Sequence, residues 1–272
     1  ALANWLVGNP SEAAAVETAY AAIRLRARAD CTVAVHGSAT QVEIGGRTFG
    51  TESTLHLKTG DELRVPAPAS GCGSYVAVSG GLNVDPALDA TSTYAPAKLG
   101  GIDGSTLKSG VILRANDAPS VLVRTLPDAF KLRHSSDFLL RIVAAPESDW
   151  IDPASLIGQN WLVGRRGDRI GLELEGSALE PLRTTQLESS AVFPGTIQCP
   201  PSGLPFLLGP DAQTTGGYPR IAQIVRADRH LIGQLRPGAH VRFQRIEPAE
   251  ARRLYRSKIA LIRQLQPDFR LD

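Results

Sequence analysis

The most informative segment of the sequence runs from Gly195 to Tyr218 and reads Gly-Thr-Ile-Gln-Cys-Pro-Pro-Ser-Gly-Leu-Pro-Phe-Leu-Leu-Gly-Pro-Asp-Ala-Gln-Thr-Thr-Gly-Gly-Tyr. An apolar run from Leu204 to Leu208 leads into amide, hydroxyl and glycine residues at 213–218. Paired glycines let another group approach the backbone, and Gln, Thr and Tyr offer hydrogen bonds without a full charge. The pattern favours a pocket for a small polar ligand. The alternative is a hairpin turn whose threonines bond their own backbone.

The order of residues in this segment resembles the signature of the KipA-like proteins. These proteins are also called allophanate hydrolase subunit 2, the 5-oxoprolinase C subunit, or the biotin-dependent carboxyltransferase domain of urea carboxylase. Further motifs of the same family are matched along nearly the whole chain. They lie at Ser74–Val84, Ser92–Tyr94, Gly100–Gly101, Gly167–Gly176, Ala227–Asp228, Gly233–Gly238 and Val241–Phe243.

The start of the chain departs from the family pattern. Members of the family carry a Val-Gln-Asp-x-Gly-Arg-like stretch and a Gly-Ala-Met-Asp-like turn before Ala-Asn-x-Leu-Val-Gly-Asn, whereas this sequence opens directly at Ala3–Asn9. It also contains no Met in 272 residues. We therefore expect it to be part of a longer product, and we assign no site residues to the preceding piece.

The composition is that of an ordinary globular protein, with 43% hydrophobic and 21% charged residues. A net charge of +2 is too small to indicate nucleic acid as a partner. The three cysteines and five histidines form no metal-binding spacing, and we expect a reducing, cytoplasmic location. Repeated prolines between 189 and 210 exclude a spanning helix in that uncharged run, and we expect no membrane partner.

Most of the first half has the alternation of short strands. One helix is expected there, with Ser11 as N-cap and an alanine-rich body over 13–22. The alternating Ile23–Arg28 segment indicates a strand whose arginines form either the solvated face of a sheet edge or an anion site. A hairpin turn is expected at Gly45–Gly46. Further strands are expected at 31–36, 41–44, 47–49, 55–57, 63–65, 75–78 and 139–143.

Three segments share the pattern Leu, base, any residue, Gly, two residues, aliphatic, Arg: Leu57–Arg64, Leu107–Arg114 and Leu235–Arg242. Such a pattern is typical of a turn that enters an outgoing strand, and it hints at two related β domains. A proline-rich and polar stretch over 115–136 marks the boundary, so we expect domains at 1–125 and 126–272. The chain is expected to end in a helix from Pro248 to Leu265, because proline is favourable in the first turn.

The resemblance implies a mainly β fold of two tandem cyclophilin-like β-barrel domains, with a few short helices and the C-terminal helix. The alternation of short strands agrees with this architecture but does not distinguish it from a sandwich.

No nucleophile elbow, phosphate-binding loop or zinc signature is present. The candidate functional groups are therefore amides, carboxylates and hydroxyls. For the predicted site we assign Asp211 and Tyr218 as catalytic candidates, with Asp211 acting as a polar anchor or a base, or else capping a turn. No metal ligands are assigned. The substrate-binding candidates are Gln198, Gln213, Thr214, Thr215, Gly216 and Gly217, with Thr93, Tyr94, Asp168 and Arg169 as weaker ones.

The resemblance implies a subunit of an ATP-dependent 5-oxoprolinase, or of a related hydrolase of amide or ureido compounds. ATP with Mg would be the cofactor, a KipI-like subunit the partner, and a LamB/YcsF-like protein the third component. One alternative is the carboxyltransferase component of a biotin-dependent urea carboxylase. Another is a non-catalytic regulator that counteracts a KipI-like inhibitor of a histidine kinase. In the 5-oxoprolinase case the chain is expected to be inactive alone.

Overall fold

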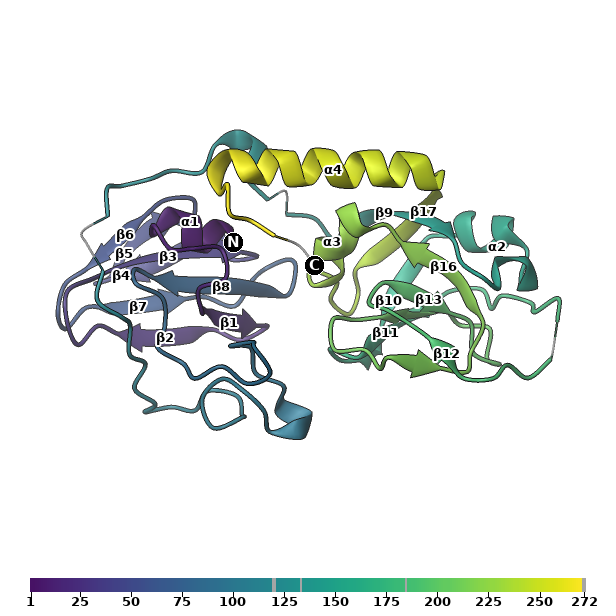
Figure 1. Ribbon diagram of the computed structural model, residues 1–272, viewed down its shortest axis with the longest axis horizontal. Helices are drawn as coiled ribbons and strands as arrows, with labels where there is room; N and C mark the ends of the chain where they lie inside the picture. Colours follow the sequence, from purple (N-terminus) through teal and green to yellow (C-terminus); the bar gives the residue numbers. More distant parts are fainter. Residues whose placement is uncertain (119–120, 133, 184, 271–272) are drawn as a thin grey trace. The chain divides into compact units, whose positions relative to one another are not determined.

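The computed structural model describes residues 1–118, 121–132, 134–183 and 185–270. It divides into two compact units, Ala1–Arg133 together with Leu261–Asp272, and His134–Ala260. β strands form most of the regular structure in each unit, as Figure 1 shows. The domain boundary expected after residue 125 stays a prediction.

The first unit contains two four-stranded sheets, with strand orders β1-β8-β3-β6 and β2-β7-β4-β5. Alternate residues of these strands face a shared apolar cluster, which includes Val33, Val42 and Leu63. Gly45 and Gly46 both have positive φ angles and join β4 to β5, which confirms the expected hairpin turn. The strands are β1 Val16–Ala19, β2 Ile23–Arg26, β3 Cys31–Gly37, β4 Gln41–Ile44, β5 Arg47–Gly50, β6 Leu55–Leu57, β7 Glu62–Val65 and β8 Gly73–Val78.

The prediction of a helix over 13–22 is wrong, because residues 16–19 form the strand β1. β1 pairs with β8 in antiparallel register, and its residues alternate between buried and exposed. The hydroxyl of Ser11 bonds the side chain of Glu12 and not a helical N–H group. Long-range pairing has therefore overridden the helix propensity of the alanines. The N-terminal helix is instead α1, Leu2–Leu6, and the short 3-10 helices η1 and η2 follow at Ala95–Ala97 and Asp128–Phe130.

The edge position of β2 is confirmed, since this strand ends its sheet and pairs only with β7 among the described strands. Arg24 and Arg26 are exposed on it and lie 3.8 and 3.6 Å from the carboxylate of Glu62. These arginines therefore belong to a solvated sheet edge.

The second unit is a closed barrel with the strand order β10-β11-β14-β13-β16-β9-β17. All pairs are antiparallel except β17 with β9, which is parallel. A two-stranded ribbon of β12 and β15 accompanies the barrel. The strands are β9 Asp137–Ala144, β10 Trp161–Gly167, β11 Gly171–Glu175, β12 Ser190–Ala191, β13 Thr196–Gln198, β14 Phe206–Leu208, β15 Thr215–Gly216, β16 Arg220–Ile224 and β17 His240–Arg245. The helices are η3 Ser148–Trp150, α2 Pro153–Ile157, η4 Arg226–Asp228, α3 Arg229–Ile232 and α4 Pro248–Leu265.

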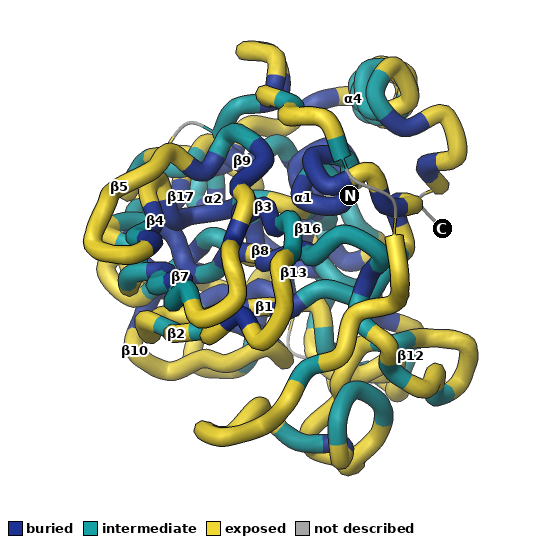
Figure 2. Tube along the Cα trace, turned by 90° about the vertical axis from the view of Figure 1, so that its left-hand side faces the viewer, coloured by how far each residue is buried: buried dark blue, intermediate teal, exposed yellow. Residues whose placement is uncertain are grey.

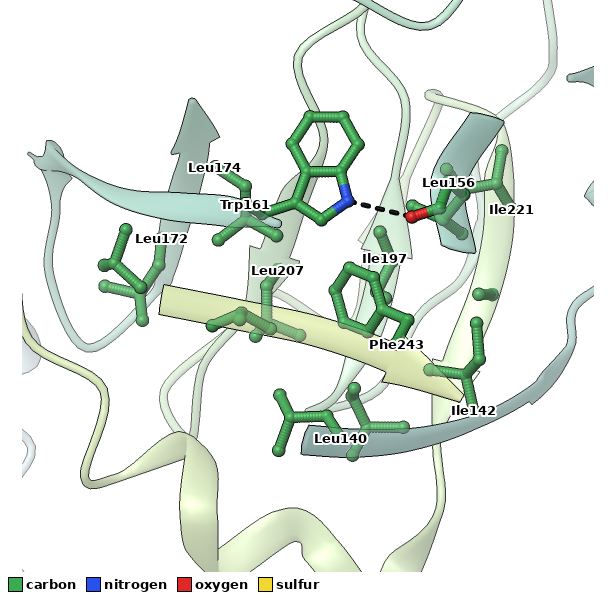
Figure 3. Close-up of a cluster of buried hydrophobic side chains, with 14 of the residues drawn as sticks. Leu140, Ile142, Leu156, Trp161, Leu172, Leu174, Ile197, Leu207, Ile221 and Phe243 are labelled. Carbon is green, nitrogen blue, oxygen red and sulfur yellow. Dashed lines mark hydrogen bonds between the residues drawn. The ribbon is translucent and has the colours of Figure 1, made fainter. Parts of the chain in front are cut away.

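The barrel is filled by apolar side chains around Trp161, which Figure 3 shows together with Ile197 and Phe243. The indole Nε1 of Trp161 donates to the carbonyl of Leu156 at 2.9 Å, so the buried N–H group has a partner. The barrel interior is thus a packed core.

The expected mainly β fold is confirmed, with a closed barrel in the second unit. In the first unit the described strands form two four-stranded sheets that share one apolar cluster. Two of the three repeated turn patterns lead into strands, β7 and β17. The third pattern, Leu107–Arg114, was also expected to enter a strand. This prediction is wrong, because residues 111–114 form no strand.

The C-terminal helix α4 has the bounds that the sequence predicted. None of its residues is fully buried, and Figure 2 shows it in the colours of intermediate and exposed residues. In the second unit, Leu254 packs with Val225 and Ile246. In the first unit, Ile262 and Leu265 pack with the cluster around Leu6. The arginines of the helix, Arg252, Arg253, Arg256 and Arg263, are exposed.

Candidate functional site

The site is built on β13, which lies between β14 and β16 in the barrel. All three residues of β13 are buried, and its register with β16 is irregular between Ile197 and Gln198. β14 is antiparallel to β13 and ends at Leu208, beside the start of β13, whereas Arg220 at the start of β16 pairs with Gln198. The segment 209–219, here called the polar loop, then connects β14 to β16.

A buried amide lies beneath the polar loop. Gln198 is 1% exposed, and its Nε2 donates to the carbonyl of Tyr218 at 3.5 Å, the outer limit of a hydrogen bond. Within the described part of the chain this is the only hydrogen bond of its side chain. A Cβ atom added at Gly216 would lie 2.7 Å from Nε2, so the glycine is what makes room for the amide. A buried amide with such weak pairing has donor and acceptor capacity left for a ligand.

The outer part of the polar loop is held by β12. Ser190 pairs with Gly216 and Ala191 with Thr215, and the N–H of Val192 donates to the carbonyl of Thr214 at 2.9 Å. This pairing leaves several predicted residues facing solvent, with Tyr218 50% exposed. The exposed residues are Gln213, Thr214, Thr215, Gly217 and Tyr218. The structure therefore brings the Gln198 amide, Gly216 and the backbone carbonyl of Tyr218 together, and leaves the Tyr218 side chain exposed.

Asp211 lies at the base of the polar loop and is paired with Arg169. The Arg169 Nε lies 2.7 Å and its Nη2 3.2 Å from the carboxylate of Asp211, and the N–H of Asp211 donates to the carbonyl of Arg169. Asp168 accepts from the N–H of Ile170 at 2.7 Å. Asp168 therefore shapes the β10–β11 turn, and Arg169 connects that turn to the polar loop. This geometry favours the role of Asp211 as an anchor.

An anchor and a base differ in how they respond to substitution. If Asp211 is an anchor, Asp211→Asn and Arg169→Gln should each lower the free energy of unfolding by at most about 1 kcal/mol, because Arg169 is half exposed. Both variants should also lower turnover by the same small factor. Denaturant titration and steady-state kinetics measure these two effects. A loss of turnover by several orders of magnitude in Asp211→Asn alone would instead make it the base.

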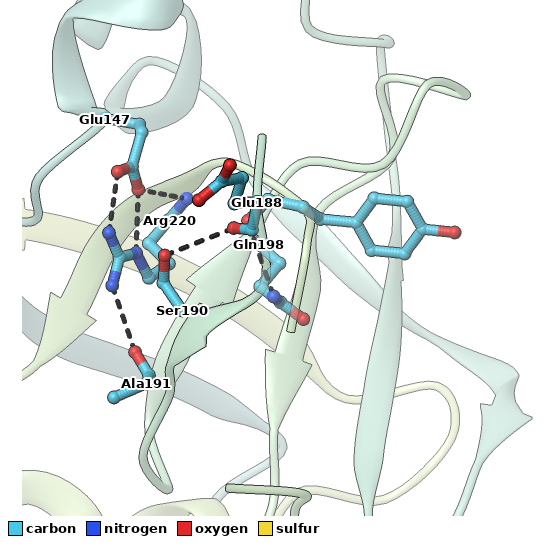
Figure 4. Close-up of polar contacts among 7 residues, drawn as sticks. Glu147, Glu188, Ser190, Ala191, Gln198 and Arg220 are labelled. Atoms are coloured by element: carbon cyan, nitrogen blue, oxygen red, sulfur yellow. Dashed lines mark hydrogen bonds and ion pairs between the residues drawn. The ribbon is translucent and has the colours of Figure 1, made fainter. Parts of the chain in front are cut away.

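The ion pair of Glu147 and Arg220 is a feature that the sequence did not predict (Figure 4). The guanidinium of Arg220 donates to both carboxylate oxygens of Glu147, from Nε to Oε2 at 2.8 Å and from Nη2 to Oε1 at 2.7 Å. Its Nη1 donates to the carbonyl of Ala191 in β12 at 3.0 Å. Hydrogen bonding from Arg220 lowers the pKa of Glu147, and Glu147 in turn raises the pKa of Arg220. The pair therefore fixes β12, and through it the polar loop, to the start of β16.

A signal for Arg220 was present in the sequence, since it follows Tyr218-Pro219 directly. Glu147 is 73 residues away along the chain, and no spacing argument connects the two. Both side chains are largely buried, at 19% and 11% exposure for Arg220 and Glu147. The contact becomes evident only once β9 and β16 are paired in the barrel.

Thr93 and Tyr94 lie in the first unit, and both are exposed. A Cβ at Gly101 would lie 1.9 Å from the hydroxyl of Thr93, so this hydroxyl rests directly against glycine backbone. Tyr94 and Leu99 bond each other through their backbones. Their assignment to the same site as the polar loop stays a prediction.

Two kinds of feature are missing from the described residues. No group of three or more His, Cys, Asp or Glu side chains gathers there as a metal site would require. No helix in that part of the chain has the length and apolar character needed to cross a membrane.

Burial raises the pKa of the Cys199 thiol, which lies next to Gln198, and so favours its protonated form.

The second unit thus combines a closed seven-stranded barrel with an amide-containing polar loop. The family model described as "Carboxyltransferase domain, subdomain A and B" matches residues 1–245, and the chain belongs to this family. It is 31% identical to the 5-oxoprolinase C subunit of Escherichia coli, over 92% of this chain and 81% of that protein. It is 29% identical to the 5-oxoprolinase C subunit of Haemophilus influenzae, over 97% and 85%.

The crystal structure of the K. lactis urea amidolyase has the same fold. It aligns with a TM-score of 0.91 and 23% identity, over 100% of this chain but only 18% of that much longer chain. The chain is therefore homologous to the 5-oxoprolinase C subunit and also to one domain of urea amidolyase. This confirms the family that the sequence motifs indicated.

Proposed function

We propose that this chain is a subunit of an ATP-dependent 5-oxoprolinase and that the polar loop binds the lactam substrate. The observation that carries the proposal is the buried, weakly paired amide of Gln198 under Gly216. A lactam presents one N–H and one C=O, which an amide side chain can match in both directions. The similarity to the 5-oxoprolinase C subunit over most of both chains supports the choice of substrate.

Each residue of the proposed site has its own role. Gln198 supports the loop from beneath and bonds the ligand when the Tyr218 carbonyl moves away from its Nε2. Tyr218 and Gln213 orient the substrate from the solvent side, and the Gly216 and Gly217 N–H groups face developing negative charge on the lactam oxygen. The Glu147–Arg220 pair keeps β12, and with it these groups, in place. Ring opening also needs activation of the carbonyl, which ATP supplies when bound to the complex.

We assign no nucleotide step to this chain. Among the described residues there is no acidic cluster to hold Mg, and the polar loop carries no lysine or arginine for phosphate groups. In this proposal the enzyme is completed by a KipI-like and a LamB/YcsF-like partner, and its setting is cytoplasmic. The chain is therefore expected to be inactive alone.

The experiment is a reconstitution of the chain with KipI-like and LamB/YcsF-like subunits. We expect glutamate to form from 5-oxoproline with ATP only when all three are present. Turnover should fall at least tenfold in Gln213→Ala and in Tyr218→Ala, measured as glutamate released per minute. ATP hydrolysis stimulated by 5-oxoproline with the purified single chain would contradict the expected partner dependence. Full turnover in both variants would contradict the site.

A carboxyltransferase activity is the second candidate, since the family model and the urea amidolyase relatives favour it. In that case biotin carries the carboxyl group, and the polar loop binds urea, which also offers amide N–H and C=O groups. The same protein is tested with carboxybiotin and urea in place of ATP and 5-oxoproline. Transfer of the carboxyl group without any turnover of 5-oxoproline would select this function over the first.

A further inference from the structure

A partly buried arginine without a partner lies in the barrel unit, in the turn that η4 and α3 form. Nε of Arg229 is screened from solvent, and no acceptor for it is present among the described residues. Its two Nη groups also form no hydrogen bond or ion pair with the described part of the chain. The proposed function uses neither this arginine nor its neighbours in the turn.

Other partly buried arginines of the barrel unit have carboxylate partners, as Arg220 has in Glu147. The carboxylate next to Arg229 in the sequence is Asp228, which is 2% exposed. It accepts from the backbone N–H, Nε and Nη2 of Arg141, so it is already paired. A buried donor without an acceptor costs free energy, and the cost is larger for a charged group. An acceptor from outside the chain would remove this cost.

A second arginine shares this face of the turn. Arg226 and Arg229 are the first residues of η4 and α3, three positions apart, and side chains at this spacing eclipse each other in a 3-10 turn. The guanidinium of Arg226 lies over the ring of Tyr255, 4.8 Å from its centroid. Tyr255 itself packs against the cluster that contains Val225 and Ala227. This cation–π contact positions Arg226 and leaves its positive charge in place.

Positive charge is in excess around Arg229. Burial and then the charge of Arg226 lower the pKa of Arg229. The Tyr255 phenol acts in the opposite direction, and no carboxylate of the described residues does. A negatively charged group at this face would therefore be stabilised by both guanidinium groups.

We propose that Arg229 and Arg226 form a binding site for a phosphate group, in which Nε and one Nη of Arg229 donate to two phosphate oxygens. The fork of a guanidinium matches this pair of oxygens, and Arg226 faces a third. A phosphate group is preferred to a carboxylate because it carries between one and two negative charges near neutral pH and meets two positive ones. The site does not depend on the lactam site of the polar loop.

The first arm of the test is isothermal titration calorimetry of the full chain with inorganic phosphate at pH 7.5, at constant ionic strength. Saturable binding is expected in the wild type and in Arg47→Gln. Arg47 is exposed on β5 of the first unit, so this control removes the same charge elsewhere. The affinity should fall at least about tenfold in Arg229→Gln and several-fold in Arg226→Gln. No saturable binding by the wild type, or equal losses in Arg47→Gln and Arg229→Gln, would overturn the site.

Arg229→Lys separates the role of Nε from a general effect of charge. Lysine keeps the positive charge but lacks the planar fork, so the affinity for phosphate should again fall about tenfold. Wild-type affinity in Arg229→Lys would show that only surface charge acts, which contradicts the proposal. The affinity should be unchanged in Gly216→Ala, since that residue belongs to the polar loop.

Thermal unfolding distinguishes a ligand site from an arginine that supports the fold. Without phosphate, Arg229→Met should unfold at the wild-type temperature or above it, because the unsatisfied donor is gone and the apolar stem is retained. Saturating phosphate should raise the unfolding temperature of the wild type and not that of Arg229→Met. An equal rise in both proteins, or a variant that is markedly less stable without phosphate, would contradict the assignment of Arg229 as a ligand-binding residue.

Competition experiments identify the chemical form of the ligand. ADP that binds more tightly than inorganic phosphate, with the gain lost in Arg229→Gln, would assign the site to the phosphate groups of a nucleotide. Tighter binding of inorganic phosphate than of ADP would assign it to the free ion. Both results support a phosphate site. Acetate that competes as strongly as inorganic phosphate would overturn the choice of phosphate.

Discussion

Glu147→Ala is expected to lower the free energy of unfolding by about 3 kcal/mol. The substitution leaves the guanidinium of Arg220, which is 19% exposed, without its carboxylate, and an unpaired charge in such a position costs about 3 to 5 kcal/mol. We take the lower end because the pair retains some contact with solvent. Chemical denaturation monitored by tryptophan fluorescence measures the change.

The matched control is Asp149→Ala, which removes an ion pair two residues further along the chain. The Arg183–Asp149 pair is exposed on both sides, at 54% and 60%, so its loss should cost well under about 1 kcal/mol. If Glu147→Ala costs no more than Asp149→Ala, the pair is not a structural clamp. The double variant Glu147→Ala with Arg220→Ala should recover part of the loss, because no unpaired charge then remains.

The pH dependence of this effect has a definite sign. The pKa of Glu147 is lower in the folded chain than its ordinary value of 4.5, because Arg220 bonds the carboxylate form. The stabilisation is therefore fully present above about pH 4.5 and is lost as the pH falls through the folded pKa. The difference in stability between wild type and Glu147→Ala should accordingly shrink below pH 4.5. A difference that is constant from pH 7 to pH 3 would contradict the assignment.

Gly216→Ala is expected to lower turnover of the reconstituted enzyme by about 100-fold, since misplacing a binding group by about 1 Å has effects of this size. The new Cβ would lie 2.7 Å from Nε2 of Gln198, so the amide must move. The clash is with the end of a flexible side chain, and the loss of stability should therefore stay near 1 kcal/mol. Thermal unfolding and steady-state kinetics on the same preparation separate the two effects.

Gly217→Ala is the control for Gly216→Ala, because alanine keeps the backbone N–H group that the proposed site uses. The nearest atom to a Cβ at this position is the carbonyl oxygen of Leu187 at 3.6 Å, an ordinary contact, so turnover should stay within about twofold of wild type. A third variant, Gly216→Ala with Gln198→Ala, removes the clash together with the amide. It should be as stable as wild type within about 1 kcal/mol and still show the low turnover. Recovery of turnover in this double variant would show that the amide is not needed.

Much of the fold could be predicted from the sequence because local patterns and tertiary contacts agree there. The helix from Pro248 to Leu265, the Gly45–Gly46 turn and most strands of the first unit have strong local signals. The segment 13–22 shows where this fails. Its alanines favour a helix, but Val16 and Thr18 gain a buried face by pairing with β8, and a local pattern does not contain that gain.

The candidate site was predictable only in part for a related reason. The motif placed Gln198, Gly216 and Tyr218 in one segment, and the barrel brings them into contact. No local pattern indicated that Gln198 is buried under the loop or that Asp211 is held by Arg169. Glu147 was missed as well, because its pairing with Arg220 depends on the alignment of β9 with β16.

The most direct test of the polar loop as a lactam site is the rate of glutamate formation from 5-oxoproline by the three reconstituted subunits. The rate should be compared for Gly216→Ala and Gly217→Ala under saturating ATP. We predict a ratio of about 50 or more in favour of Gly217→Ala, with similar unfolding temperatures for the two. Equal rates for the two variants, both close to wild type, would contradict the placement of the substrate at Gln198 and Gly216.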